Sequence, residues 1–451
     1  MAFITKRWAD VIIFCILLIG SWLRAGWYGD LRLSVSNPET NSYIESSRAP
    51  LLSWKAFTGS RLFTTNLIFK VANDEKKCPV TAYSAPAAGK ESARANQPCF
   101  DKIALLQNYL SIFGWCFLAW MLSRRLKSPF IRITAAIIIV LFGFTPQVAE
   151  WDSILSPESL SLSLFAIAFA LLIELAFRVS ASKMSFSAVP ERLLFTIWMI
   201  VFLLWIFVRD VHLYAIVTSL GLIVILLLFK KFRETKYIAA AIVLLTSVFI
   251  VGFISAKQSF RATRYPVVNA VDFYILPYPQ RAEFFKKFDM PERESPGYQE
   301  WADANASKAY GLFLISHPGF IITTLWENMP QFTSDFIQPY FMLDMKTRDS
   351  LLVVGEMVHP QTASVFVIDL LLMIALCAHA IKYRGASITA WMWLAAWFLS
   401  IAAITLFLSF FGDIYGTRRH IMPSVEMLRL FQWIFLMPFL DRSLTSTEKT
   451  S

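Results

Sequence analysis

The sequence predicts an all-α protein that crosses a membrane about ten times. Its 451 residues are 56% hydrophobic and 15% aromatic, and only 16% are charged. A soluble domain is typically about 45–50% apolar and about 25% charged, so this composition excludes an ordinary soluble protein. Apolar stretches also recur at lengths close to the roughly 20 residues that a helix needs to cross a bilayer. They are residues 9–28, 103–122, 133–149, 158–177, 193–208, 213–229, 237–255, 364–381, 388–411 and 424–440.

Lysine and arginine residues give the orientation of these helices. Four of the short loops between them are basic, and all four lie on the same side of the membrane as Lys6 and Arg7. Because cytoplasmic loops carry an excess of lysine and arginine, we expect both termini to be cytoplasmic. The net charge of +10 then reflects membrane topology and does not indicate nucleic-acid binding. The basic residues of the four loops are Arg124, Arg125, Lys127 and Arg132; Arg178, Lys183 and Arg192; Lys230, Lys231, Arg233 and Lys236; and Lys382 and Arg384.

This topology places two long loops on the outer side. The first, residues 29–102, follows an apolar helix without a small-x-small cleavage motif, so we expect that helix to remain uncleaved. The stretch from Trp54 to Phe69 mixes apolar and aromatic side chains with Arg61, which predicts an amphipathic helix on the membrane surface. Cys78 and Cys99 lie further along the loop and can form a disulfide if this compartment is oxidising.

The second outer loop, residues 256–362, is too long to be a simple connector. Its stretch from Tyr310 to Met329 is apolar enough to suggest an eleventh span. Pro318 and Gly319 interrupt this stretch, and an odd number of spans would reverse the C-terminal basic loops, so we expect a re-entrant or surface helix. The expected organisation is an N-terminal membrane module (1–255), the outer region (256–362) and a C-terminal membrane module (363–451).

Carboxylates gather in the outer loops. Glu39 follows the first helix, and the short loop between the third and fourth spans contains Glu150, Asp152 and Glu158. A carboxylate in such a position can accept a proton from a hydroxyl or bind a metal ion. Alone, Glu39 would be a solvated loop residue, and the Ser-Pro-Glu sequence ending at Glu158 also favours the start of a helix. Helix initiation does not account for Glu150 and Asp152.

Basic residues also occur on the outer side, against the usual charge bias. Arg418, Arg419 and His420 precede the last span, and Arg209 lies next to Asp210 at the end of an apolar segment. Arginine binds phosphate through two parallel hydrogen bonds, so these residues fit a site for a lipid phosphate. The alternatives are that Arg209 pairs with Asp210 to anchor a helix end, and that the Arg-Arg-His group binds phospholipid headgroups.

At these residues the chain resembles the GT-C membrane glycosyltransferases, which are multi-span enzymes that use sugars linked to polyprenyl phosphates. The resemblance covers most of the topology, and its motifs are short. The matching features are Glu39 with Ser42 and Tyr43 in the first outer loop, Arg61 later in that loop, the Leu-Ser-Pro-Glu-Ser-Leu turn around Glu158, Arg209 after the fifth span, and Arg419-His420 with Pro423 before the last span.

The resemblance implies an inverting transfer of a hexose or pentose, as in mannosyl- or arabinosyltransferases, from a polyprenyl-phosphate donor to a hydroxyl of a glycan, lipid or protein acceptor. The compact loops, and not the resemblance, suggest a bacterial inner membrane with the active side outward. Glu39 is the implied base, with Glu150, Asp152 and Glu158 as further catalytic candidates. The implied phosphate-binding residues are Arg61, Arg209, Arg418, Arg419 and His420, and the implied substrate-lining residues are Tyr43, His212 and His317.

A metal ion is not assigned. Glu39 stands where an aspartate is commoner in that family, and no Asp-x-Asp pair adjoins it. These departures leave a divalent cation, Mg²⁺ or Mn²⁺, as an open option.

Two other functions fit a membrane protein of this kind: a lipid or solute transporter (a flippase), and an inactive assembly subunit. A transporter is expected to carry polar or helix-breaking residues near the middle of the bilayer. Here Glu174 and Asp369 lie near the ends of their spans, and the polar clusters gather at one surface. This distribution favours chemistry at the surface over transport, but it does not separate an enzyme from an inactive relative.

Overall fold

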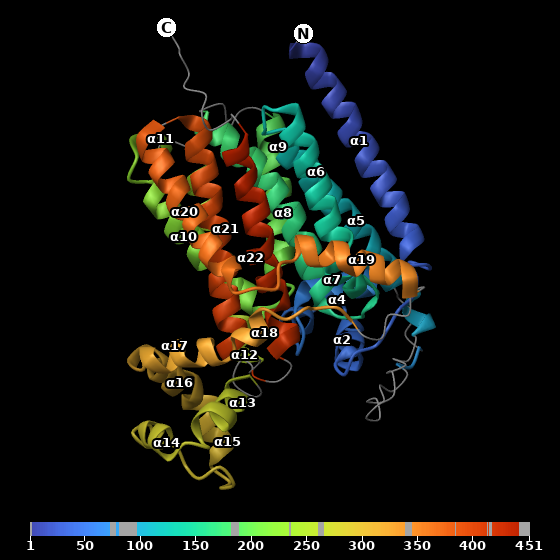
Figure 1. Cartoon of the computed structure of the whole chain (residues 1–451). Coiled ribbons are helices and arrows are strands. Elements are labelled where there is room, and N and C mark those ends of the chain that lie inside the picture. Colours follow the sequence, from blue (N-terminus) through green and yellow to red (C-terminus); the bar gives the residue numbers. More distant parts are fainter. Residues whose placement is uncertain are drawn as a thin grey trace.

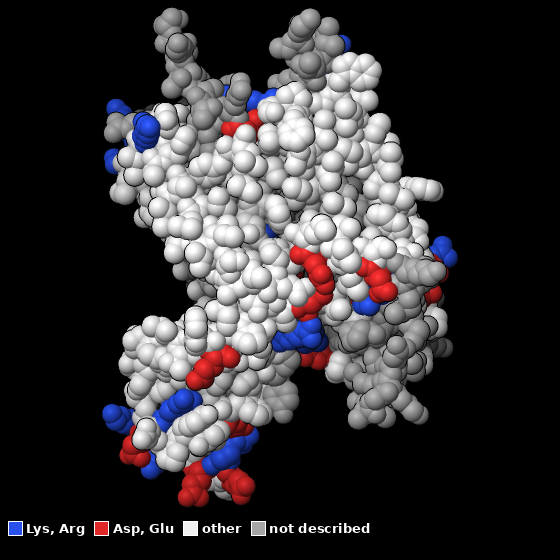
Figure 2. Space-filling view, viewed as in Figure 1, with Lys and Arg blue, Asp and Glu red and all other residues white. Residues whose placement is uncertain are grey.

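The computed structural model describes residues 2–72, 78–80, 97–181, 189–233, 236–259, 266–338, 345–383, 385–412, 414 and 417–441. Over these residues the chain forms a bundle of long helices, with a lobe of short helices beyond one end (Figure 1). The surface in Figure 2 is nearly free of charged residues along the middle of the bundle, while lysine, arginine and acidic residues lie toward the two ends and on the lobe. An uncharged band of this kind is expected of a protein that crosses a membrane.

Each predicted membrane stretch coincides with a helix. Of the described helices, seven are long and apolar enough to cross a membrane, and the count reaches nine if each of two bent helix pairs is one span. The chain is thus an all-α multi-span membrane protein, and the number ten stays a prediction. The helices are α1 (Ala2–Trp27), α5 (Asp101–Ser123), α6 (Pro129–Phe144), α8 (Pro157–Ser180), α9 (Val189–Ile206), α10 (Tyr214–Leu226), α12 (Lys236–Gln258), α20 (Ser364–Tyr383), α21 (Ala386–Gly412) and α22 (Thr417–Leu440).

Three of these ten helices are missing from the strict count: α6 enters only as a bent pair with Pro146–Ser153, and α10 and α22 are missing for other physical reasons. α10 has only 13 residues, although the short helix η3 (Asp210–Leu213) precedes it directly. α22 has 24 residues, but it contains Glu426 and Arg429, which pair with each other inside the bundle. The first residue described in α1 and the C-terminal end of α22 lie at the same end of the bundle, opposite the lobe (Figure 1).

α8 is the central helix of the bundle. It packs against α5, α9, α21 and α22, and almost all of its residues are buried. A helix that is apolar on every side is stable only when other helices surround it. Gly114 of α5 allows close approach to α8, because a Cβ atom added there would lie 2.8 Å from the backbone carbonyl oxygen of Ser163.

The first outer loop is fixed to the turn that precedes α8. Val35 forms a parallel bridge with Ile154: the Val35 N–H donates to the Ser153 carbonyl at 2.8 Å, and the Leu155 N–H donates to the Val35 carbonyl at 3.0 Å. The Thr40 hydroxyl also donates to the Leu155 carbonyl at 3.1 Å. These bonds place Glu39, just before α2 (Thr40–Ser47), beside the start of α8.

The predicted amphipathic segment forms two short helices instead of one. They are α3 (Trp54–Thr58) and α4 (Phe63–Ala72), and Gly59 ends the first of them. α4 packs on α2 and α5, so this part of the loop covers the outer end of the bundle. The remaining short helices of the bundle are η1 (Pro98–Phe100), α7 (Pro146–Ala149), η2 (Glu150–Ser153), α11 (Lys230–Arg233) and α19 (Met345–Val358).

The lobe is built from the second outer loop. Within it, helices Tyr298–Ser316 and Pro318–Glu327 meet at His317 at an angle of 88°, so residues 310–329 do not form a straight eleventh span. Pro318 starts the second helix of the pair, as expected for a proline at the first helical position. The helices of the lobe are α13 (Val268–Ala270), η5 (Val271–Ile275), α14 (Pro279–Lys286), α15 (Tyr298–Trp301), η6 (Ala302–Ala306), α16 (Ser307–Ser316), α17 (Pro318–Glu327) and α18 (Met329–Phe332).

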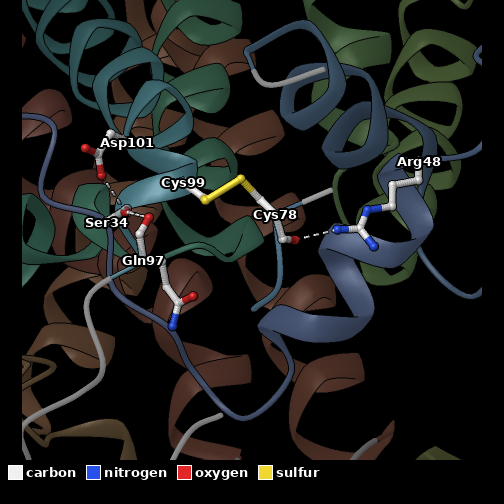
Figure 3. The surroundings of a disulfide bond; sticks show 6 residues. All are labelled: Ser34, Arg48, Cys78, Gln97, Cys99 and Asp101. Atoms are coloured by element: carbon white, nitrogen blue, oxygen red, sulfur yellow. Dashed lines mark hydrogen bonds between the residues drawn. A yellow bond between two sulfur atoms is a disulfide. The ribbon is translucent and has the colours of Figure 1, made fainter. Parts of the chain in front are cut away.

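A disulfide joins Cys78 to Cys99 across a separation of 21 residues (Figure 3). Arg48 donates to the Cys78 carbonyl at 2.7 Å, and the Ser34 hydroxyl donates to the Gln97 carbonyl at 2.5 Å. These bonds tie the returning end of the first outer loop to α2 and to the segment before the Val35 bridge. The sequence left this pairing open. In the structure, the disulfide helps to hold the first outer loop in place.

We expect non-reducing peptide mapping to recover Cys78 and Cys99 in one linked peptide pair, and Cys15, Cys116 and Cys377 as free thiols. Replacing Cys78 and Cys99 by alanine should lower the melting temperature, because the disulfide restricts the loop in the unfolded chain. The free energy of unfolding should fall by an amount on the order of 3 kcal/mol. Cys377→Ala is the control and should leave the melting temperature unchanged. Alkylation of Cys78 in the intact protein without reductant would contradict the assignment.

Candidate active site

Seven of the residues selected from the sequence meet at the outer end of the bundle. They come from the first outer loop and α2, the turn before α4, the first turn of α8, the residue before η3, and the first turn of α22. Their sequence separations reach 380 positions, so only the fold brings them together. The seven residues are Glu39, Tyr43, Arg61, Glu158, Arg209, Arg419 and His420.

Glu39 is the centre of this cluster. Arg419 Nη2 lies 2.7 Å from its Oε1, Arg61 Nη1 lies 3.0 Å from its Oε2, and the Tyr43 hydroxyl donates to Oε2 at 3.1 Å. The Asn37 side-chain oxygen accepts the Glu39 backbone N–H at 2.7 Å, a local turn that asparagine commonly forms. About a third of the Glu39 side chain is exposed (34%), so a ligand can reach it.

The two arginines keep Glu39 ionised. Burial by itself raises the pKa of Glu39, but the positive charges of Arg419 and Arg61 and the hydrogen bonds to the carboxylate outweigh it and hold the pKa below its ordinary value. Burial raises the pKa of Tyr43, which therefore remains a phenol that can donate. The site thus presents a charged carboxylate at neutral pH.

Arg61 is oriented by the Ser42-Tyr43 pair. Its Nε and Nη2 donate to the Ser42 hydroxyl at 2.9 and 2.6 Å, and its Nη1 donates to the Tyr43 hydroxyl at 3.2 Å. Its guanidinium also lies over the Tyr43 ring, 4.1 Å from the ring centre, in a cation–π contact. The motif residues after Glu39 therefore position an arginine from later in the loop.

Arg419 joins two carboxylates. Besides Glu39, its Nε lies 3.3 Å from Oε1 of Glu158, a residue with no exposed surface. Neither oxygen of Glu158 accepts a hydrogen bond from a residue that the structure describes, so the ion pair with Arg419 is its main stabilising contact there. An ionised carboxylate buried at this depth needs a positive partner. Arg419 therefore holds the start of α8 and the first outer loop against α22.

His420 connects Arg209 to this group. Arg209 lies within hydrogen-bond distance of the His420 carbonyl (3.1 Å) and of its Nδ1 (3.0 Å), and Arg419 Nη2 lies 3.2 Å from its Nε2. A guanidinium can only donate hydrogen bonds, so the ring is neutral, and its one unprotonated nitrogen accepts from one of the two arginines. Arg61, Arg209 and Arg419 together form a strongly positive site that contains one accessible carboxylate.

Glu150 and Asp152 lie outside the cluster. Glu150 is fully buried; it accepts hydrogen bonds from Arg348 Nε and from the Gln338 backbone, both at 2.7 Å. Asp152 is buried against Arg24 Nη2 at 3.1 Å and accepts a bond from the Ser159 hydroxyl at 2.6 Å. The structure therefore pairs both acids with arginines away from Glu39, and their selection as catalytic candidates stays a prediction. Both occupy a tightly packed loop in which every charge needs a partner.

Three other selected residues also lie apart from the Glu39 cluster: His212, His317 and Arg418. His212 is buried, stacks on Trp205 with ring centres 4.2 Å apart, and faces the Ser161 hydroxyl at 3.1 Å. His317 lies at the joint of α16 and α17 in the lobe. Arg418 is exposed and donates to the Asp335 carbonyl.

A cavity of about 400 Å³ lies against the other side of Arg419. Small-molecule sites typically measure roughly 300–1,000 Å³, so this one suits a small group. Of the residues that line it, only Arg418 and Arg419 stood out in the sequence, because they are charged. The other lining residues could not be recognised from the sequence. The lining residues are Asn37, Pro38, Trp151, Ile154, Gln331, Phe336, Ile337, Gln338, Thr417, Arg418 and Arg419.

The residues present do not suit a resident divalent cation. Among the described residues, no three acidic, histidine or cysteine side chains come together as a metal-binding group. Glu39 and Glu158 both pair with the guanidinium of Arg419, so a divalent ion would have to displace that cation to reach them. The positive charge at this site is supplied by arginine.

Comparison with known proteins gives only distant structural neighbours. No family model matches the sequence, and no curated protein matches it. The archaeal oligosaccharyltransferase AglB from Archaeoglobus fulgidus, in complex with an inhibitory peptide and a dolichol-phosphate, is 13% identical with a TM-score of 0.46, over 99% of this chain and 53% of that one. Its apo form is 12% identical with a TM-score of 0.43, over 96% and 51%.

The complex of the Archaeoglobus fulgidus oligosaccharyltransferase with Zn and sulfate is 12% identical with a TM-score of 0.44, over 94% of this chain and 48% of that one. The chain spans about half the length of these structures. Similarity at this level concerns shape and says nothing about activity.

The buried ion pair between Arg24 and Asp152 should contribute to the stability of the protein. Arg24→Met leaves the buried carboxylate of Asp152 without its cation, so the free energy of unfolding should fall by roughly 3–5 kcal/mol. Adding Asp152→Leu should recover part of this loss, because the unpaired charge is then removed as well. The measurement is thermal or denaturant unfolding in detergent.

The matched control is Lys286→Met, which breaks the exposed pair with Glu283 and should leave the stability almost unchanged. An Arg24→Met protein as stable as the control would show that Asp152 does not depend on Arg24.

Proposed function

We propose that this protein is a GT-C-type glycosyltransferase that moves a sugar from a polyprenyl-phosphate donor to an acceptor hydroxyl at the outer face of the membrane. The observation that carries the proposal is Glu39, an accessible carboxylate held by Arg61 and Arg419 at the outer end of the bundle. A polyprenyl chain lies in the bilayer, and a site at this level can reach its phosphate without drawing the lipid out of the membrane.

Arg61, Arg209 and Arg419 are the phosphate-binding residues in this proposal, with His420 positioned between two of them. A lipid phosphate gains negative charge as it leaves the sugar, and fixed positive groups at that point lower the barrier. Guanidinium groups suit this role, because they are always charged and can bind phosphate oxygens in pairs.

Glu39 is the proposed base. The acceptor hydroxyl gives its proton to the Glu39 carboxylate while its oxygen bonds to the anomeric carbon, and the bond from that carbon to the phosphate oxygen breaks, with its electron pair leaving on the phosphate. Attack from the face opposite the phosphate inverts the anomeric configuration. The step is balanced without an additional reactant.

A carboxylate paired with two arginines is a weak base, because a good general base has a pKa near the working pH. Binding of the donor changes this situation. A phosphate on Arg61 and Arg419 shares their positive charge, so Glu39 loses part of the attraction that keeps its pKa low. Glu39 then becomes more basic only when the donor is in place, which limits its reaction with water.

Glu39→Gln should reduce transfer by about 10²–10⁴-fold, because glutamine keeps the shape but accepts no proton at the reaction step. The measurement is single-turnover transfer from a panel of radiolabelled polyprenyl-phosphate sugars by purified protein. Glu45→Gln is the matched control, since Glu45 is an exposed acid of α2, the helix that directly follows Glu39, and is paired with Arg48.

Equal loss in both variants would point to damage of α2 and against a base. Transfer that survives Glu39→Gln would leave a glycosyltransferase with a different base. Donor binding without transfer by the wild-type protein would favour a transporter or an inactive assembly subunit.

The pH dependence of transfer should depend on the positive charges of Arg419 and Arg61. Because Arg419 and Arg61 lower the pKa of Glu39, the acid limb of kcat/KM, which reports the free enzyme, should lie below the ordinary glutamate pKa. Arg419→Gln removes the larger of these two charges, so the same limb should move to higher pH in the remaining activity. An acid limb at the same pH in both proteins would contradict an ion pair between Arg419 and Glu39 in the free enzyme.

A further inference from the structure

The cavity beside Arg419 presents hydrogen-bond donors and positive charge. Among the described residues, its lining contains Arg418 and Arg419 and no aspartate or glutamate. Its other described residues are partly apolar, with Trp151, Ile154 and Phe336 among them, and partly neutral and polar. The polar edge of Trp151 is already engaged, since its Nε1–H donates to the Phe336 carbonyl at 3.1 Å. The unused binding capacity of the cavity therefore lies at its positive end.

The N-terminus of α22 forms that end. Thr417 and Arg418 are the first residues of this 24-residue helix, and both line the cavity. The first N–H groups of a helix have no acceptor within the helix, and the helix dipole adds partial positive charge there. Anions commonly bind at such positions.

Asn37 supplies an independent observation. It is 4% exposed and lines the same cavity; its Oδ1 accepts the Glu39 N–H, but its Nδ2 has no hydrogen-bond partner among the described residues. Buried donors are nearly always paired, so an unpaired donor on a residue that lines a cavity indicates a missing acceptor atom. A ligand oxygen is the acceptor that would satisfy it.

We propose that this cavity binds an oxyanion, a phosphate or carboxylate group, that belongs to the acceptor substrate. Arg419 lines the cavity and also pairs with Glu39, so an acceptor anchored here lies next to the base, while the donor phosphate occupies Arg61, Arg209 and Arg419 in the Glu39 cluster. The assignment to the acceptor rests on the proposed glycosyltransferase function. The anion site itself does not depend on it.

The first experiment measures binding of inorganic phosphate to the full-length protein in phosphatidylcholine nanodiscs by calorimetry. Two independent phosphate sites are expected in the wild-type protein. Arg418→Gln should weaken one of them at least about tenfold, Arg418→Lys should retain most of the affinity, and Arg209→Gln should weaken only the other. Arg124→Gln, at the opposite end of the bundle, is the control and should leave both sites unchanged.

A second variant tests the donor atom of Asn37. Asn37→Asp keeps an oxygen for the Glu39 N–H and replaces the unpaired Nδ2 with a negatively charged oxygen. It should abolish phosphate binding at the Arg418 site. Unchanged phosphate affinity in both Arg418→Gln and Asn37→Asp would overturn the anion site.

The second experiment compares transfer to matched acceptors with and without a phosphate or carboxylate. The wild-type protein should prefer the charged acceptor through a lower KM, and Arg418→Gln should reduce that preference about tenfold. A wild-type preference for neutral acceptors would overturn the assignment to the acceptor. Absence of transfer to any acceptor, with Arg418-dependent phosphate binding intact, would refute the acceptor role while supporting the anion site.

A lipid headgroup is the other source of the same chemistry. Titration with phosphatidylglycerol in the nanodisc distinguishes it, because a headgroup site would lose its phosphate as this lipid is added. Displacement specifically from the Arg418 site would overturn the assignment to the acceptor. Phosphate binding that is independent of phosphatidylglycerol supports it.

Discussion

The outer half of this structure depends on the pairing of Arg419 with Glu39 and Glu158. Glu158 begins the most buried helix of the bundle, Glu39 belongs to the first outer loop, and Arg419 begins the last helix. One guanidinium therefore joins three parts of the chain that no short-range contact would hold together. Because each carboxylate is stabilised by the same cation, a change at any of the three residues alters the charge balance of the other two.

Two further buried ion pairs hold the surrounding loops. Arg24 fixes Asp152, and Arg348 fixes Glu150 together with the backbone of Gln338, which lines the cavity. These pairs set the position of the cavity wall. The Val35 bridge and the Cys78–Cys99 disulfide then attach the first outer loop to the same turn. The outer site is thus rigid where it is buried and accessible only around Glu39 and the cavity.

Much of this arrangement could be predicted from the sequence, because membrane helices and charge bias leave strong local signals. Glu39, Arg209 and Arg419 stood out as charges at outer helix ends, and the structure brings them together. The sequence could not separate Glu39 from Glu150 and Asp152, since their partners Arg348 and Arg24 lie 198 and 128 positions away. Asn37, Gln331 and Gln338 gave no signal at all, because a neutral amide gains its role only from the cavity around it.

The shared arginines also couple the proposed steps thermodynamically. If a donor phosphate on Arg61 and Arg419 raises the pKa of Glu39, then protonation of Glu39 must strengthen donor binding by the same factor, since such coupling is reciprocal. The free enzyme therefore holds its carboxylate ionised and weakly basic, and the donor-bound enzyme holds a stronger base beside a filled phosphate site. An anionic acceptor in the adjoining cavity would act in the same direction through Arg419. Reactivity would then be greatest only when both substrates are bound.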